Sequence, residues 1–218
     1  MYITTNQSWK KNMSTPNKHW DTTFSTKKDS ELGWYEKDVL QTLKFLDQIP
    51  HNESPKVFLP GAGTSVLVDE LLVRGFHLIL NDISDEALNK LRKRTGTNKK
   101  LRWLHHDISK PLPGDIPQAD IWIDRAVLHF LLEEEDIRGY FENVHSMINN
   151  QGYVLLAEFS KAAPPKCSGL PLHRYTVTEM TDRMGPEFEL LTHENYTYIN
   201  PFGEPRPYIY ALYKKQRH

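Results

Sequence analysis

The sequence has little cysteine, little net charge and no long apolar run. Cys167 is the single cysteine, so no disulfide can form within the chain, and a lone thiol fits a reducing compartment. The 27 basic residues nearly balance the 28 acidic ones, which argues against a strong overall attraction to nucleic acid or to an anionic membrane. No run of 18 apolar residues is present, and the polar residues 1–18 contain no hydrophobic signal region. We therefore expect a cytoplasmic protein that binds neither nucleic acid nor membrane, while the sequence gives no indication of its oligomeric state.

The length of 218 residues suits one domain with a substantial core. We expect residues 1–18 to be flexible and residues 19–218 to form that domain. Its first part, residues 19–50, is rich in aromatic side chains and includes Trp20 and Trp34. Because aromatic faces bury a large area at a small entropic cost, we interpret this part as a flap over a flat ligand. Ordinary core packing is the alternative.

A glycine turn, residues 60–65, separates an apolar run that predicts a strand from a run with the spacing of a helix. Gly61 and Gly63 permit a positive φ and let a ligand approach the backbone around Ala62, and the start of the helix offers free N–H groups. Val66 stands where a third glycine would support a pyrophosphate, which argues against NAD as the ligand.

A carboxylate ends the next predicted strand. The apolar residues 76–80 lead to Asp82, which stands 21 positions after Gly61. In an α/β unit, a carboxylate about 20 residues beyond such a turn accepts hydrogen bonds from ribose hydroxyls. The turn and Asp82 together predict a nucleoside site, with an ordinary structural turn as the alternative.

Strand and helix patterns alternate along the chain, which predicts a mostly parallel sheet covered on both faces. The expected fold is α/β and Rossmann-like: a doubly wound, seven-stranded sheet with a C-terminal antiparallel hairpin. A proline-rich loop, residues 161–174, is expected to form a substrate wall. The predicted strands span residues 57–59, 76–80, 101–104, 119–123, 153–159, 188–199 and 208–213, and the predicted helices span residues 36–49, 66–72, 85–95, 133–150 and 178–184.

Two segments, Phe-Leu-Pro-Gly-Ala-Gly-Thr-Ser at 58–65 and Leu-Ile-Leu-Asn-Asp at 78–82, resemble motifs of the class I S-adenosylmethionine-dependent methyltransferases. The resemblance spans roughly residues 19–215. Further segments resemble a group of small bacterial-type methyltransferases: His-Trp at 19–20, Gly-Trp-Tyr-Glu at 33–36, Asp-Arg-Ala-Val-Leu-His-Phe-Leu at 124–131 and Lys-Cys-Ser-Gly-Leu-Pro-Leu-His-Arg-Tyr at 166–175. The resemblance implies methyl transfer with S-adenosyl-L-methionine as cofactor.

The resemblance also implies roles for particular residues. It places Gly61, Ala62 and Gly63 under the methionine part of the cofactor, Asp82 at the ribose, Ile83 and Ile108 against the adenine, Asp107 at the adenine edge, and Asp124 and Arg125 near the methionine end. The aromatic faces of Trp20 and Trp34 suit a sulfonium cation.

Two departures from the family pattern narrow the implied function. Residues 58–60 lack the acidic side chain that the family often places near the methionine amine. No Asn/Asp-Pro-Pro-Tyr motif follows the strand predicted at 119–123, which argues against methylation of an amide or adenine nitrogen.

His129 and Arg174 are the candidate catalytic residues. His129 follows the fourth predicted strand on the crevice side, where it suits a base or a group that orients the acceptor; a structural role is the alternative. Arg174 has a planar guanidinium that could bind an acceptor carboxylate. An ion pair with Glu158 or Glu179 is the alternative. Cys167 is interpreted as a structural thiol.

We expect no metal site, because adjacent residues such as His105 and His106 point to opposite faces of a strand. The leading hypothesis is direct in-line methyl transfer from S-adenosylmethionine to a small-molecule acceptor. The alternatives are a protein-lysine methyltransferase and a protein that binds S-adenosylmethionine or S-adenosylhomocysteine without turnover. A nicotinamide-dependent oxidoreductase is the weakest rival.

Overall fold

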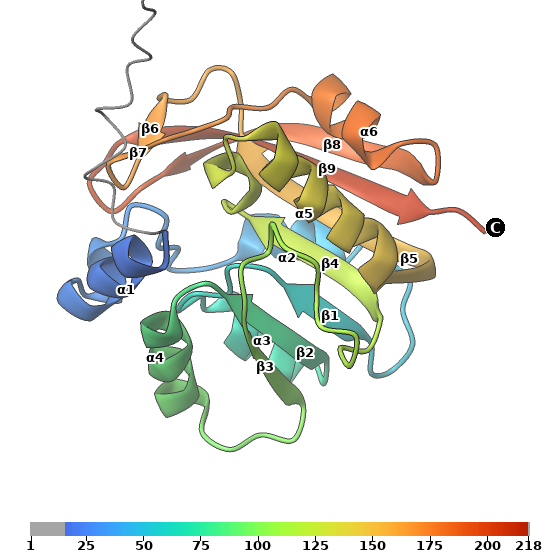
Figure 1. The fold of residues 1–218 in the computed structure, drawn as a ribbon, viewed down its shortest axis with the longest axis horizontal. Helices are drawn as coiled ribbons and strands as arrows, with labels where there is room; N and C mark the ends of the chain where they lie inside the picture. Colours follow the sequence, from blue (N-terminus) through green and yellow to red (C-terminus); the bar gives the residue numbers. More distant parts are fainter. Residues whose placement is uncertain (1–15, 218) are drawn as a thin grey trace, which may run out of the picture.

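The computed structural model describes residues 16–217, and a seven-stranded sheet runs through its centre (Figure 1). The strand order is β3-β2-β1-β4-β5-β9-β8. The first five of these strands are parallel, β9 is antiparallel to β5, and β8 is antiparallel to β9. This topology confirms the predicted fold class. The strands are β1 (Lys56–Leu59), β2 (His77–Asp82), β3 (Leu101–His105), β4 (Ala119–Arg125), β5 (Ile148–Phe159), β8 (Phe188–Ile199) and β9 (Pro205–Lys215).

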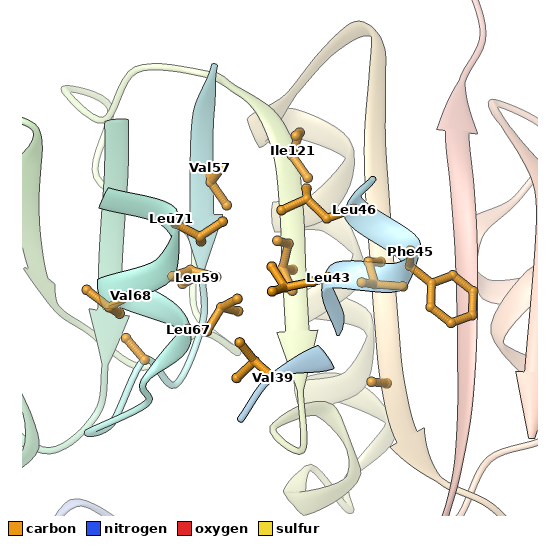
Figure 2. Packing of buried hydrophobic residues seen from close by; sticks show 14 of the residues in the cluster. Val39, Leu43, Phe45, Leu46, Val57, Leu59, Leu67, Val68, Leu71 and Ile121 are labelled. Atoms are coloured by element: carbon orange, nitrogen blue, oxygen red, sulfur yellow. The ribbon is translucent and has the colours of Figure 1, made fainter. Parts of the chain in front are cut away.

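Helices cover both faces of the sheet, as the alternation of side chains along the strands requires. In β1, Val57 and Leu59 belong to one buried cluster while Phe58, between them, belongs to the cluster on the opposite face. Figure 2 shows the first cluster, in which helices α2 and α3 pack on β1 and β4. The helices are α1 (Pro16–Thr26), α2 (Leu40–Leu46), α3 (Leu67–Val73), α4 (Asp85–Thr95), α5 (Glu134–Met147) and α6 (Val177–Met184), with 3₁₀ turns η1 (Asp29–Glu31) and η2 (Leu128–Phe130). None of the helices within residues 16–217 is long and apolar enough to cross a membrane.

Several elements differ from the sequence-based expectation. Helix α1 begins at Pro16, so residues 16–18 are helical, whereas the expectation of flexibility for residues 1–15 lies outside the described residues. Strand β5 begins at Ile148, although the sequence predicts a helix as far as residue 150. Apolar residues near this boundary fit the spacing of a helix as well as that of a strand. The proline-rich loop contains a short hairpin of β6 (Lys166–Cys167) and β7 (Leu170–Pro171).

Gly139 fixes how closely α5 approaches the loop after β3. A Cβ atom added at Gly139 would lie 2.1 Å from the backbone oxygen of Ser109. We expect Gly139→Ala to lower the free energy of unfolding by about 1–3 kcal/mol, because backbone must move to admit the methyl group, despite the better helix propensity of alanine. Denaturant unfolding measures the change. Gly114→Ala is the control, since nothing lies within 4 Å of its added Cβ, and equal effects of the two substitutions would contradict the prediction.

Candidate functional site

A cavity of about 780 Å³ opens at the carboxyl ends of the parallel strands. Its wall is formed by the glycine turn after β1, the end of β2, the loops after β3 and β4, the segment 16–36 and the β6–β7 hairpin. We call residues 16–36, which contain α1 and η1, the lid. In Figure 1 the lid lies beside α4. The cavity therefore collects segments that are far apart in the sequence.

The glycine turn is tied to the neighbouring strand by backbone hydrogen bonds. Gly61 and Gly63 have φ of 53° and 52°, a region that glycine enters without strain. The N–H of Ala62 donates to the carbonyl of Asn81 at 2.8 Å. A Cβ at Gly61 would lie 2.2 Å from Cγ2 of Val127, so this position requires glycine for packing as well as for conformation. The predicted turn thus has the predicted conformation.

Asp82 has a structural task that the sequence did not indicate. Its carboxylate accepts the N–H of Gly63 at 2.8 Å through Oδ2 and that of Ser84 at 2.8 Å through Oδ1. The residue is 5% exposed, and burial raises its pKa to about 6. It lines the cavity, and each carboxylate oxygen has a further lone pair for a ligand hydroxyl. Asp82 therefore joins the glycine turn to the start of α4 and still faces the predicted ribose position.

The residues predicted around the adenine also come together. Ile83, Asp107 and Ile108 all line the cavity. Asp107 accepts the N–H of Ser109 at 2.9 Å through Oδ1, and Ile108 is 6% exposed. The turn that follows β3 is therefore stabilised by the carboxylate that the sequence places at the adenine edge.

Aromatic rings form the inner surface of the lid. The ring of Trp20 lies 5.5 Å from that of Trp34 and 4.9 Å from that of Phe130, both in edge-to-face geometry. Asp21 also accepts the hydroxyl of Ser84 at 2.7 Å, so the lid contacts the N-terminal end of α4. Trp20, Trp34 and Phe130 line the cavity. The aromatic segment thus covers the cavity and also packs against the domain.

Arg125 fastens the far end of the lid. Its Nη1 donates to the carbonyl of Trp34 at 3.0 Å, and its Nη2 lies 3.0 Å from Oε1 of Glu36. The guanidinium carbon lies 5.2 Å and 5.0 Å from the ring centres of Tyr198 and Tyr208. Arg125 and Glu36 both line the cavity. Sequence analysis missed Glu36, and its only signal was the Gly-Trp-Tyr-Glu segment at 33–36.

Asp124 and His129 are not among the residues that line the cavity. Asp124 is fully buried and accepts the hydroxyl of Tyr140 at 2.6 Å and the N–H groups of Val127 and Leu128 at 3.0 Å and 3.2 Å. These bonds hold a turn in which Ala126 has φ of 70°, a strained value for a residue with a Cβ. Although sequence analysis placed Asp124 near the methionine end, its side chain faces the protein interior and shapes the loop.

His129 pairs with a carboxyl group in the interior. Its Nδ1 lies 2.7 Å from Oε2 of Glu158, and neither side chain is exposed. Burial lowers the pKa of His129 to about 3 and raises the pKa of Glu158 well above its usual value, so burial disfavours the charged form of both groups. The carbonyl of His129 accepts the N–H of His173 at 2.9 Å. His129 therefore connects the loop after β4 to β5 and to the end of the proline-rich loop, and it does not reach the cavity as a base would.

Arg174 also lies away from the cavity wall. Its Nη1 donates to the carbonyls of Lys161 and Ala163 at 3.0 Å each, so it closes the proline-rich loop instead of pairing with Glu158 or Glu179. Cys167 is buried and does not line the cavity. Among residues 16–217, no three His, Cys, Asp or Glu side chains converge to hold a metal ion.

We expect His129→Ala to lower the free energy of unfolding by about 3 kcal/mol, because it removes the imidazole that pairs with the buried Glu158 and opens a void. Chemical denaturation of the purified variant measures this loss. His193→Ala is the control, since His193 is exposed on β8 and its removal should change stability by less than about 0.5 kcal/mol. A His129→Ala variant as stable as the His193→Ala control would contradict the prediction.

Comparisons with known proteins agree with this geometry. Residues 60–154, from the glycine turn to the middle of β5, match the family described as "Methyltransferase domain". No curated protein matches the sequence. A solved S-adenosylmethionine-dependent methyltransferase from Anabaena variabilis ATCC 29413 superposes with a TM-score of 0.73 at 17% identity, over 92% of this chain and 93% of that chain.

Two further solved structures have the same fold. The N-methyltransferase NodS from Bradyrhizobium japonicum WM9, in complex with S-adenosyl-L-homocysteine, superposes with a TM-score of 0.70 at 11% identity, over 91% of this chain and 100% of that chain. The Burkholderia thailandensis 1,6-didemethyltoxoflavin-N1-methyltransferase has a TM-score of 0.60 at 17% identity, over 76% of this chain and 72% of that chain. Residues 60–154 thus match a methyltransferase domain, and the fold of the chain is that of solved S-adenosylmethionine-dependent methyltransferases.

Proposed function

We propose that the cavity binds S-adenosylmethionine and that the protein transfers its methyl group to a small-molecule acceptor. The observation that carries the proposal is the convergence of the glycine turn, Asp82 and the aromatic lid on one cavity. When bound, the cofactor supplies a methyl group on a sulfonium, which an acceptor attacks by in-line displacement. The residues present fit this ligand, because a buried carboxylate, the backbone of the glycine turn and apolar side chains line the same cavity.

The predicted binding residues that line the cavity, which exclude Asp124, then have tasks at its wall. Backbone at Gly61, Ala62 and Gly63 supports the methionine part, and Asp82 accepts the ribose hydroxyls. Ile83 and Ile108 cover the adenine while Asp107 accepts a hydrogen bond at its edge. The faces of Trp20 and Trp34 stabilise the sulfonium cation and exclude water.

The acceptor chamber lies under the lid, between Phe130 and the β6–β7 hairpin. Phe130, Gly169, Leu170 and Pro171 line this side of the cavity, whereas Phe159 is buried behind it. In this proposal His129 and Arg174 act at a distance: they hold the two loops that carry the chamber walls. An enclosed, largely apolar chamber favours a small acceptor that the lid can cover.

An acidic rim favours a second candidate, a protein-lysine methyltransferase. Residues 133–136 are four consecutive acidic residues at the start of α5, and Glu133 and Asp136 line the cavity. Asp136 is paired with Lys110 at 2.7 Å, while Glu133 has no ion pair within residues 16–217. A rim of this kind attracts a protonated amine.

One experiment distinguishes the candidates. The purified protein is incubated with methyl-labelled S-adenosylmethionine and, in separate reactions, with panels of small amines, thiols, carboxylates and hydroxyl compounds, and with a protein extract. Label in a small product supports the leading proposal, and label in a lysine side chain supports the second. Tight binding of S-adenosylhomocysteine without any transfer would indicate a non-catalytic binding protein, and binding of NAD instead would refute the cofactor assignment.

Asp82 gives a pH-dependent prediction. Ribose hydroxyls bind the ionised carboxylate, whose pKa in the free protein is about 6, so affinity for S-adenosylhomocysteine should rise as the pH rises through 6. We expect Asp82→Asn to weaken binding by on the order of 1–3 kcal/mol at pH 7.5 and by much less at pH 5. Calorimetry at several pH values measures the ratio of the two dissociation constants. A ratio that is the same at both pH values would remove Asp82 from the ribose site.

A further inference from the structure

The end of β1 carries no carboxylate, although the resemblance of residues 58–65 to a methyltransferase motif implies one near the methionine amine. Leu59 stands at this position, is 4% exposed and lines the cavity. This part of the cavity therefore has a carboxylate only if another segment of the chain supplies it.

Glu36 of the lid brings a carboxylate to this part of the cavity. Strand β1 pairs with β4 so that Phe58 lies opposite Trp122, which puts Leu59 level with Ile123, and Arg125 follows two residues later. Glu36 lies 3.0 Å from Arg125, and both line the cavity. The pair thus stands beside the end of β1, next to the glycine turn.

The two side chains are buried but incompletely bonded. Glu36 and Arg125 are 10% and 12% exposed. Nε and Nη2 of Arg125 make no hydrogen bond, although Nη2 is close to one oxygen of Glu36. Burial raises the pKa of Glu36, and the nearby Arg125 opposes that rise. The buried guanidinium therefore retains donors that a ligand can satisfy.

We propose that Glu36 and Arg125 form a clamp for the amino-acid end of the methyl donor. Glu36 accepts the α-ammonium group, and Arg125 donates to the α-carboxylate. The charges of the pair complement those of a zwitterion, and the ligand supplies the hydrogen bonds that the buried groups lack. Glu36 thereby replaces, from the lid, the carboxylate that β1 does not provide. The inference rests on the proposed binding of S-adenosylmethionine.

Three ligands distinguish the contribution of Glu36 from that of Arg125. S-adenosylhomocysteine carries both charged groups, 5′-S-(3-aminopropyl)-5′-thioadenosine carries only the ammonium, and 5′-methylthioadenosine carries neither. We expect Glu36→Gln to weaken binding of the first two ligands by about tenfold and to leave 5′-methylthioadenosine within about twofold. Calorimetric dissociation constants provide the readout and require no turnover.

Arg125→Lys should give a different pattern with the same ligands. Lysine keeps the positive charge but lacks the planar guanidinium that binds a carboxylate through two hydrogen bonds. We therefore expect about tenfold weaker binding of S-adenosylhomocysteine but little change for the two ligands without a carboxylate. Because Arg125 also holds the lid at Trp34, affinity for 5′-methylthioadenosine reports any general damage to the cavity. Glu70→Gln is the matched control, since Glu70 is exposed on α3 and does not line the cavity.

Two results would overturn the clamp. If Glu36→Gln weakened all three ligands equally, the pair would serve only to fasten the lid, and if it weakened none, Glu36 would have no role in binding. Failure of the wild-type protein to bind any of the three ligands would refute the proposed donor site itself, so the two proposals fail in different ways.

Discussion

The site depends on one buried carboxylate that joins two strand ends. Asp82 accepts the N–H of Gly63 from the turn after β1 and the N–H of Ser84 at the start of α4. Without these bonds, two backbone N–H groups and the carboxylate would lose their partners in a largely buried place. The same side chain lines the cavity, so the geometry of the turn and the shape of this part of the cavity wall cannot vary independently.

The fold could be predicted from the sequence because its strongest signals are local. Runs such as 57–59 and 153–159 are apolar and short, and the helix at Glu134–Met147 has a clear apolar face. The elements that the sequence did not predict are stabilised mainly by tertiary contacts. The β6–β7 hairpin has only four strand residues, and α1 is stabilised by its contact with α4, so neither produces a pattern in the sequence.

The residues that line the cavity could be predicted only where they stand at or just beyond the end of a strand. Gly61, Asp82 and Ile108 stand at strand ends, and parallel strands bring their carboxyl ends to one edge. Side-chain direction and burial cannot be obtained this way. Asp124 and Arg125 are the last two residues of β4 and His129 follows them, yet Asp124 and His129 point into the interior while Arg125 lines the cavity. Glu36 was missed because its partner Arg125 is 89 positions away in the sequence.

Two hydrogen bonds hold the end of the lid in place. Tyr198 of the C-terminal hairpin donates to the carbonyl of Tyr35, and Arg125 of β4 donates to that of Trp34. Both bonds restrain the end of the lid beside the cavity. Movement of this end away from the cavity therefore requires breaking a bond from the C-terminal hairpin as well as one from β4, which couples access to the cavity to the stability of the sheet edge.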